Sequence, residues 1–428
     1  MLTQKQTELG QVLQHVAEEL DISPTDYQRA VGSYTAVGNW LKDGHAKGFY
    51  QGSTAEPEIY PQGSINLGTV VRPICDGKES EFDVDLVCEL QAFHTLIAPK
   101  TLKHQVGACL RDNAIYRDKM DPEGKRCWTL KYAESAGIGF HIDILPCAPN
   151  LAAIHTPYKG AIQITHKHKA NNDYNWLSSN PKGFAEWFRT RNSVFAEFAP
   201  MQKQTVFETA RSTPGGKLIF ASVKEVPDQL VRTPLQRAIQ LMKRHRDMRF
   251  VAAPDFKPIS IIISTVAASL YQGETDIYSA LMGIVDRLAL HSGLIDNQYF
   301  AVNELVAKLK LISRTGDGKW WLSNPADPHE NFADKWHEDN HARAKAFFNW
   351  VNQLHADVSG IPFGKGLPVV GGYLKPFFGE RATSAAVGRL GDSLLKSREK
   401  GALKMQAGTG ILAATGTVAV KAHNFYGH

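Results

Sequence analysis

The chain has 428 residues, of which 43% are hydrophobic and 21% are charged, a composition that excludes general disorder. Its 48 basic residues exceed its 43 acidic residues by a net charge of +5, which is too small for the whole surface to act as a nucleic-acid platform. The five cysteines are odd in number and form no Cys-x-x-Cys pair, so neither a disulfide framework nor a zinc knuckle is indicated.

Helices are predicted at the start of the chain and a sheet after them. Apolar residues over 9–20 and over 27–41 recur with a helical period, and Ser23 before Pro24 is the pattern of an N-cap followed by a first-turn proline. Over 60–146 the apolar period changes to two, which predicts strands.

The helical period returns after residue 180, most clearly over 181–198, 234–249 and 259–271. Beyond about residue 275, helical segments alternate with loops such as 323–329. We therefore expect an α+β fold: a catalytic core with a mixed sheet and N-terminal helices over 1–200, and a mostly helical lobe over 201–405. The last segment, 406–428, is rich in Gly, Ala and Thr, which predicts a flexible tail.

The strongest functional signal is a pair of aspartates on a predicted strand. Alternation along 81–87 places Asp83 and Asp85 on one face and apolar residues on the other. The later run 139–145 repeats the pattern with Asp143. Three carboxylates can therefore meet above one sheet. His141 lies on the same side of its strand as Asp143. It is either a partner of the site or a structural residue.

Such a cluster needs cations, because neighbouring carboxylates repel one another and lose hydration. Magnesium suits it, since magnesium prefers hard oxygen ligands and keeps positions for water and phosphate. The sequence thus predicts Asp83, Asp85 and Asp143 as catalytic, Mg²⁺-binding residues, with Mn²⁺ as a substitute.

A Gly-Ser pair lies upstream of these aspartates. Gly63 removes the side chain that would keep a phosphate off the backbone, and the Ser64 hydroxyl can donate to a phosphate oxygen. With Gln62 they are our candidate nucleotide-binding residues. A Gly-Ser pair alone is more often an ordinary turn, and an Asp-x-Asp strand is often a solvated face. The order of the pair, the strand and a later lone aspartate favours the catalytic interpretation.

Two later residues are candidates for contacts to a triphosphate. In the helix predicted over 235–247, the apolar stripe leaves Lys243 at its margin, where its ammonium could reach a phosphate. Alternatively, Lys243, Arg244 and Arg246 form a solvated basic face, and periodicity favours neither interpretation. Ser260 either contacts phosphate or caps the helix that follows.

Taken together, these motifs resemble those of the bacterial cGAS/DncV-like nucleotidyltransferases, the CD-NTases. The resemblance covers most of the chain and is carried by PQGS, FDVDLV, HIDILP, SNPKGFAEWF, LQRAIQLMKRHRD, KPIS and NPADPHENFADKW. It implies a polymerase beta-like nucleotidyltransferase fold and an enzyme of anti-phage defence. The N-terminus has no apolar signal-like run, from which we expect a cytoplasmic protein. Its substrates would be ATP and other nucleoside triphosphates, and its product a cyclic di- or trinucleotide.

The resemblance also implies roles for the candidate residues. Gly63 and Ser64 would grip the donor triphosphate, Lys243 and Ser260 would clamp it, and the three aspartates would bind two Mg²⁺ ions. The animal relatives carry a zinc-binding insertion and basic surfaces for double-stranded DNA; this sequence has neither, so we do not expect activation by DNA.

Two other functions share these features. A template-independent nucleotidyltransferase acting on RNA or a small molecule uses the same Gly-Ser and Asp-x-Asp core. A nucleotide-binding assembly protein would use its pocket and tail for partner contacts. The tail ends with Phe425 and Tyr426, which either receive a regulatory protein partner or dock on the enzyme itself. No apolar run is long enough for a membrane span, so no membrane contact is expected.

Overall fold

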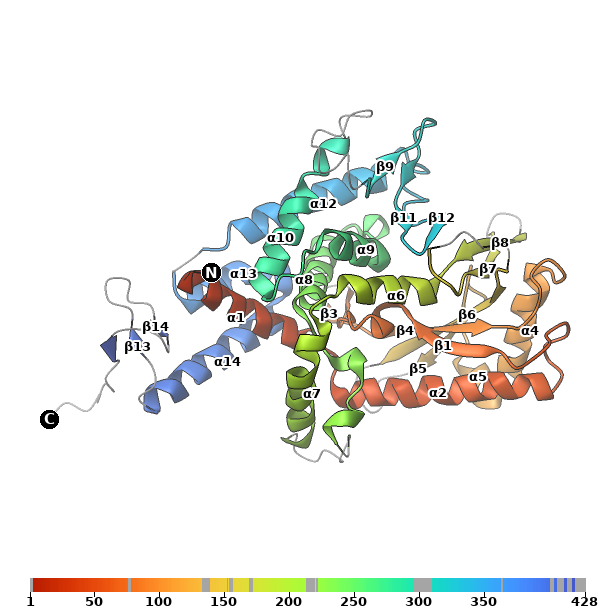
Figure 1. The fold of residues 1–428 in the computed structure, drawn as a ribbon, viewed down its shortest axis with the longest axis horizontal. Helices are drawn as coiled ribbons and strands as arrows, with labels where there is room; N and C mark the ends of the chain where they lie inside the picture. The colour runs from red at the N-terminus through yellow and green to blue at the C-terminus, as the bar shows by residue number, and fades with distance from the viewer. Residues whose placement is uncertain are drawn as a thin grey trace.

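The computed structural model consists of a mixed β-sheet with helices on one face and a helical lobe against its other side (Figure 1). It describes residues 3–405 except 76–77, 133–138, 152, 154–156, 169–171, 213–219, 221, 296–309, 363–364 and 401–403, and in the tail residues 412–413 and 418–419. The expected α+β fold is confirmed.

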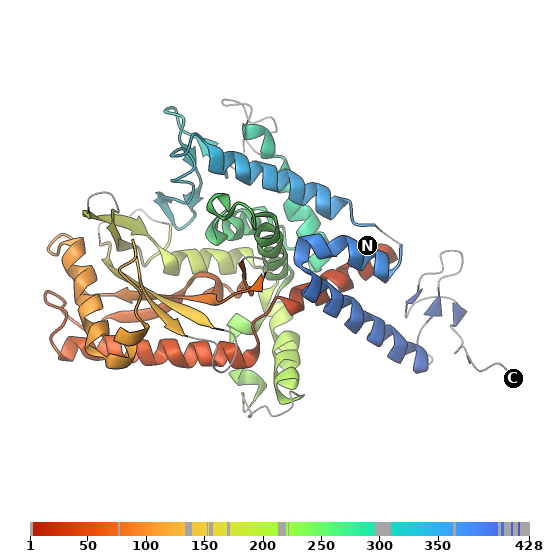
Figure 2. The same cartoon turned by 180° about the vertical axis from the view of Figure 1, so that it is seen from behind.

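The two N-terminal helices form where the sequence predicts them, as α1 (Gln4–Glu19) and α2 (Pro24–Ala46). Ser23 is the N-cap of α2: its hydroxyl accepts a hydrogen bond from the Asp26 amide at 3.0 Å, and Pro24 occupies the first turn. The helices separate in space, because α1 packs beside α8, α10 and α14 in the helical lobe whereas α2 lies along the sheet (Figures 1 and 2).

The central sheet has the strand order β1-β4-β6-β7-β8, and β5 pairs with the first half of β6. The strands are β1 (Glu58–Gln62), β4 (Phe82–Glu89), β5 (Trp128–Tyr132), β6 (Phe140–Pro149), β7 (Ile162–Lys167) and β8 (Tyr174–Ser179). β4 and β6 run parallel, and the other pairs are antiparallel. Two short strands, β2 (Ile74–Cys75) and β3 (Lys78–Glu79), form a separate hairpin.

One face of this sheet packs against α2 and α4 (Pro99–Asp112), and α5 (Ala114–Lys119) packs against β5. The apolar residues Phe82, Val84 and Leu86 point into this core. The prediction of strands alone over 60–146 is therefore wrong, since α4 and α5 lie inside that range. The buried residues of α4 follow a helical period, which the strand assignment overlooked.

The helical lobe surrounds α8 (Pro234–Arg249), which is buried on all sides from Pro234 to Asp247. Around it lie α9 (Ser260–Leu270), α10 (Ile277–Ala289), α12 (Ala342–Ser359) and α13 (Leu367–Phe378), and α14 (Glu380–Glu399) packs against α1 and α13. The helices predicted over 234–249 and 259–271 are confirmed. The division of the chain near residue 200 stays a prediction. The first 200 residues do not all belong to the sheet core, because the apolar residues of α1 lie in the hydrophobic core of the helical lobe.

Two boundaries differ from the sequence expectation. The predicted helix over 181–198 is two helices, α6 (Pro181–Arg191) and α7 (Phe195–Ser212), because the backbone at Asn192 leaves helical geometry with ψ +55°. The segment 323–329, expected as a loop, contains β11 (Ser323–Asn324) and the start of β12 (Asp327–Asn331), which pair as a hairpin. β12 packs against β8 and so joins the lobe to the sheet.

The tail prediction falls mainly outside the described residues, and so do Phe425 and Tyr426. The described parts are β13 (Lys404–Met405), β14 (Leu412–Ala413) and β15 (Val418–Ala419), which pair as a small sheet. A protein partner at the tail stays a prediction. Among the described helices, none combines the length and apolarity that a bilayer crossing requires.

Candidate active site

The three predicted carboxylates come from two neighbouring strands. In the parallel register of β4 and β6, Asp85 lies opposite Asp143, and Asp83 lies opposite His141. Their side chains leave the sheet on the face away from the α2 and α4 core, because their apolar neighbours point into that core. The alternation read from the sequence therefore brings the aspartates to adjacent positions.

Neighbouring side chains hold the ends of this row. Thr129 of β5 lies opposite Asp143 and donates its hydroxyl hydrogen to Asp143 Oδ1. The His141 ring lies between Glu81 and Asp83: its Nε2 contacts a Glu81 carboxylate oxygen, and its Nδ1 is 3.5 Å from Asp83 Oδ1. His141 is thus a direct neighbour of the carboxylate row.

Burial and like charge raise the pKa of Asp85. Desolvation is the largest cause, the charges of Asp83 and Asp143 add to it, and Lys243 opposes it, which together bring the pKa to about 7. A divalent cation would remove this penalty by neutralising the carboxylates.

The chemistry of the donor set fits a magnesium ion, since it consists of carboxylate oxygens, the ligands that Mg²⁺ prefers. Over the described residues, no group of three or more His, Cys, Asp or Glu side chains already lies close enough together to hold a metal ion. The fit therefore rests on the kind and register of the donors.

Gly63 follows β1 and opens the short helix α3 (Gly63–Asn66), and its preceding neighbour Gln62 lies opposite Asp85. Its φ is +65°, and a Cβ there would lie 2.1 Å from Asp85 Oδ2. The glycine is required because the Asp85 carboxylate lies directly against its backbone. The sequence argument assigned this close approach to a phosphate, and in the structure a catalytic candidate makes it.

Ser64, Asp83, Lys243 and Ser260 line one cavity of about 290 Å³ between the sheet and the lobe. The Lys243 ammonium donates to the Thr69 carbonyl oxygen at 2.9 Å and to the Thr69 hydroxyl at 3.0 Å. Burial, followed by the charge of Arg246, lowers the pKa of Lys243 to about 7.

The alternative that Lys243, Arg244 and Arg246 form a solvated basic face is wrong, because each of the three is at most 5% exposed. The expectation that Lys243 lies at the margin of a buried stripe also needs correction, since α8 is buried on all sides. The helix-cap alternative for Ser260 is wrong as well. Ile259 occupies the N-cap of α9, and Ser260 Oγ accepts a hydrogen bond from Arg246 Nη1 at 3.1 Å.

The same cavity contains three charged residues that the sequence reasoning did not assign to a site. Arg246 and Lys257 bring positive charge beside Lys243, and Asp247 orders both of them. Asp247 Oδ1 accepts from Arg246 Nη2 at 2.7 Å and lies 3.5 Å from Lys257 Nζ. The spacing of Lys243 and Arg246 on one helix could have indicated this cluster.

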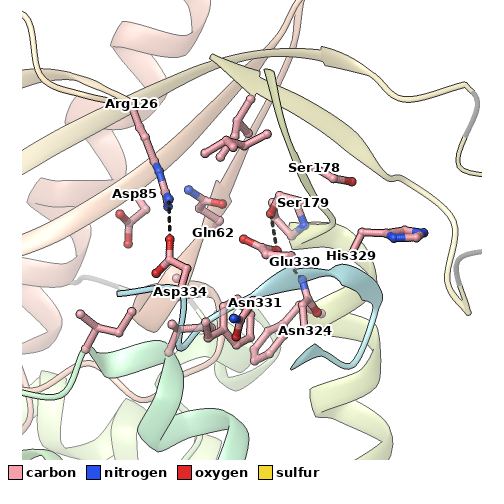
Figure 3. A pocket seen from close by; sticks show the side chains of 18 of the residues that line it. Gln62, Asp85, Arg126, Ser178, Ser179, Asn324, His329, Glu330, Asn331 and Asp334 are labelled. Atoms are coloured by element: carbon pink, nitrogen blue, oxygen red, sulfur yellow. Dashed lines mark hydrogen bonds and ion pairs between the residues drawn. The ribbon is translucent and has the colours of Figure 1, made fainter. Parts of the chain in front are cut away.

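A second cavity of about 610 Å³ lies between the sheet and the lobe (Figure 3). Gln62, Gly63 and Asp85 line one part of it, and side chains from β8, β11 and β12 line another. Ile259 lines both cavities and is 54% exposed. No sequence motif indicated this space, since its walls come from segments more than a hundred residues apart.

Within this second cavity lies the half-buried carboxylate of Glu330 on β12. Burial, the largest cause, raises its pKa to about 7, although hydrogen bonds from Asn324 and Ser179 oppose the shift. Arg126 and Asp334 form an ion pair at 4.0 Å beside it, which links the sheet side to the lobe (Figure 3).

Comparison with known proteins agrees with this geometry. The sequence profile of the family described as cyclic GMP-AMP synthase DncV-like, nucleotidyltransferase domain, matches residues 57–146, which contain both predicted aspartate motifs. A c-di-GMP synthase of Roseivirga ehrenbergii is 30% identical to the chain over 426 residues, 98% of each protein. The cyclic dinucleotide synthase CdnG of Bradyrhizobium diazoefficiens is 24% identical, over 98% of this chain and 94% of that one.

The fold comparison agrees as well. The solved structure of CdnG of Bradyrhizobium diazoefficiens in complex with GTP matches with a TM-score of 0.63 at 22% identity, covering 90% of this chain and 99% of that chain. Fold and sequence together define a nucleotidyltransferase that uses nucleoside triphosphates. The chain belongs to the DncV-like CD-NTases, the cyclic dinucleotide synthases that make cyclic nucleotide second messengers.

Proposed function

We propose that the enzyme joins two molecules of GTP into a cyclic dinucleotide in a Mg²⁺-dependent reaction, with Asp83, Asp85 and Asp143 as the metal ligands. The observation that carries this proposal is the register of β4 and β6, which sets Asp85 opposite Asp143 beside a cavity lined by cations. GTP takes precedence over the ATP expected from the sequence because one relative is named a c-di-GMP synthase and another was solved with GTP.

The two cavities suit the two parts of a nucleotide. The smaller one would receive the triphosphate, where Lys243, Arg246 and Lys257 supply positive charge and Ser64 and Ser260 supply hydroxyls. The larger one would receive the nucleoside. Ile259 lies between them as an exposed apolar surface on which the sugar can rest.

The reaction consists of two phosphoryl transfers. In each, a ribose hydroxyl attacks the α-phosphorus of a triphosphate, a new phosphodiester forms, and pyrophosphate leaves. Magnesium, when bound, supplies charge neutralisation of the triphosphate and a lowered pKa of the attacking hydroxyl. The three carboxylates would hold the magnesium, and the buried cations Lys243 and Arg246 would orient the leaving phosphates. The linear product must then turn around for the second transfer, which the larger cavity has room for.

Product analysis tests this proposal. The purified protein is incubated with the four nucleoside triphosphates, singly and mixed, with Mg²⁺ or with Mn²⁺, and the products are resolved by mass. We expect a phosphatase-resistant cyclic dinucleotide from GTP alone. An extended primer or a nucleotidylated small molecule would instead support the template-independent transferase. Anti-phage signalling and the regulatory partner at the tail stay predictions from the family resemblance.

Lys243→Met should weaken binding of GTP more than it weakens the fold. A charge-assisted hydrogen bond is worth about 1.5–3 kcal/mol, so the dissociation constant should rise roughly 10- to 100-fold. Calorimetric titration with a GTP analogue that cannot be cleaved between the α- and β-phosphates measures this.

Arg244→Met is the matched control, since Arg244 is equally buried on the same helix but donates to the carbonyl oxygens of Arg72 and Phe378, outside the cavity. It should lower the melting temperature without changing nucleotide affinity. Unchanged affinity in Lys243→Met, together with a large loss of stability, would make Lys243 a structural residue.

A further inference from the structure

Glu330 is held in the larger cavity by hydrogen bonds at one of its two oxygens. Oε2 accepts from Ser179 Oγ at 2.9 Å and from Asn324 Nδ2 at 2.7 Å. In Figure 3 these two partners flank Glu330, with Gln62 and Asp85 to one side. Among the described residues no hydrogen bond to Oε1 is found, so this oxygen is presented to the cavity as an acceptor.

The orientation of the Asn324 amide is fixed, which makes its role as a donor definite. Its Oδ1 accepts a hydrogen bond from the Ala326 amide at 2.8 Å, so its Nδ2 must face Glu330. Asn324 is 2% exposed and cannot turn outward. A carboxylate that is fixed in this way and half-buried loses part of its hydration, and a ligand with donor groups would replace the hydrogen bonds it loses.

The other carboxylates nearby are already engaged. Asp327 accepts from the Ser178 hydroxyl and from the His329 amide, one bond at each oxygen. Asp334 is half exposed and lies against Arg126. Asp85 also lines this cavity, and it is one of the proposed metal ligands. Glu330 therefore differs from these carboxylates, because it combines a fixed position with an oxygen for which no hydrogen bond is found among the described residues.

The walls beside Glu330 suit a flat aromatic ligand. Leu177 and Phe332 line the cavity, and the Phe332 ring is held edge-on against Phe184 with ring centres 6.0 Å apart. A fixed acceptor beside apolar and aromatic side chains is an arrangement that recognises a base by its hydrogen-bonding edge.

We propose that Glu330 is the residue that selects guanine, by accepting hydrogen bonds from the N1–H and N2–H₂ groups of the base. Guanine presents these two donors side by side, whereas the matching edge of adenine has an acceptor at N1, and uracil has one donor between two acceptors. A carboxylate oxygen attracts the first edge and repels an acceptor placed against it. This inference rests on the proposed function, because it takes the larger cavity as the nucleoside site.

Glu330→Gln should replace the hydrogen-bond acceptor at the position of Oε1 with a donor. Because Asn324 Nδ2 can only donate, the new amide must place its oxygen where Oε2 was and its NH₂ group where Oε1 was. A donor then faces the guanine donors. We expect affinity for a GTP analogue with an uncleavable α–β bridge to fall roughly 100-fold, and affinity for the ATP analogue to rise, because the new NH₂ group can donate to adenine N1.

Glu338→Gln is the matched control, since it makes the same chemical change at an exposed residue of the same lobe. It should leave both affinities as in the wild type. Melting temperatures of both variants show whether they fold. Wild-type GTP affinity in a folded Glu330→Gln protein would overturn the proposal.

Wild-type enzyme gives an independent test that needs no variant. The guanosine, inosine and adenosine analogues should bind in that order, because inosine keeps N1–H but lacks the N2 amino group. Adenosine binding as tightly as guanosine would overturn the assignment of Glu330 even if the variant fails to fold. The failure of the proposed function can be told apart from the failure of this inference. The proposed function fails alone if product analysis yields no cyclic dinucleotide, the wild type still binds the three analogues in this order, and Glu330→Gln removes the order.

Discussion

Asp85→Asn, alone or with Asp83→Asn, is expected to abolish cyclic dinucleotide formation, by more than about 1,000-fold, while the protein stays folded. Both side chains lie on the face of β4 that points away from the sheet core, so the substitutions remove ligands and no packing. Product formation per enzyme, measured by mass at saturating Mg²⁺ and GTP, gives the loss. Asp118→Asn, at a residue 77% exposed on α5, should keep full activity.

Thermal unfolding separates metal binding from general damage. Mg²⁺ at 100 times its dissociation constant should stabilise the wild type by about 2.7 kcal/mol and leave the double variant unchanged.

The pH dependence of the metal-free protein has a definite sign. The pKa of Asp85 is about 7 in the folded state and ordinary when unfolded, so its stability contribution is present at low pH and is lost as pH rises to about 7. Asp85→Asn should therefore raise the melting temperature in chelator at pH 8 but not at pH 4. Two results of the preceding experiments would contradict the assignment of Asp83 and Asp85 as metal ligands. One is wild-type activity in the double variant, and the other is equal stabilisation of the wild type and the double variant by Mg²⁺.

Gly63→Ala should lower activity roughly 100-fold, the scale of loss expected when a catalytic group is displaced by about 1 Å. A methyl group at this position would lie 2.1 Å from Asp85 Oδ2, so the carboxylate must move. The positive φ adds a strain of about 1–2 kcal/mol that any alanine in this conformation carries.

Gly48→Ala isolates that strain, because Gly48 has a φ of +78° and a methyl group there would meet nothing within 4 Å. It should show the same modest loss of stability and no loss of activity. If both variants lose stability equally and both stay active, Gly63 is a turn residue and its contact with Asp85 has no catalytic consequence. Steady-state rates at saturating GTP and Mg²⁺ decide between the two.

The positions of the three candidate carboxylates could be predicted because they depend on local geometry. Alternation along a strand sets the direction of Asp83 and Asp85, and the apolar neighbours of Asp143 set its direction in the same way. The three carboxylates then come together if β4 and β6 are neighbours in one sheet. The cap of α2 at Ser23 was predictable for the same reason.

The environment of Lys243 could not be predicted, because helical periodicity assumes that a polar residue marks a solvated face. In α8 the polar side chains from Gln236 to Asp247 are buried, and several of them bond to distant parts of the chain. Arg237 and Gln240 bond to Asp21, and Lys243 bonds to Thr69. Pairings across 170 residues or more leave no local pattern.

The base-selecting candidate was missed for a similar reason. Glu330 bonds to Ser179 across 151 positions of sequence, and the segment 323–329 just before it was expected to be a loop. The packing of β12 against β8 creates the cavity, and that contact exists only once both lobes have folded.

The most direct test of the catalytic centre is the location of its cations. Crystals grown with Mn²⁺ and a GTP analogue that cannot be cleaved between the α- and β-phosphates would show each ion by anomalous scattering. We expect two manganese ions bound by Asp83, Asp85 and Asp143, with the triphosphate in the cavity lined by Ser64 and Lys243. A triphosphate bound elsewhere, or no manganese at these carboxylates in crystals that contain the nucleotide, would contradict the account.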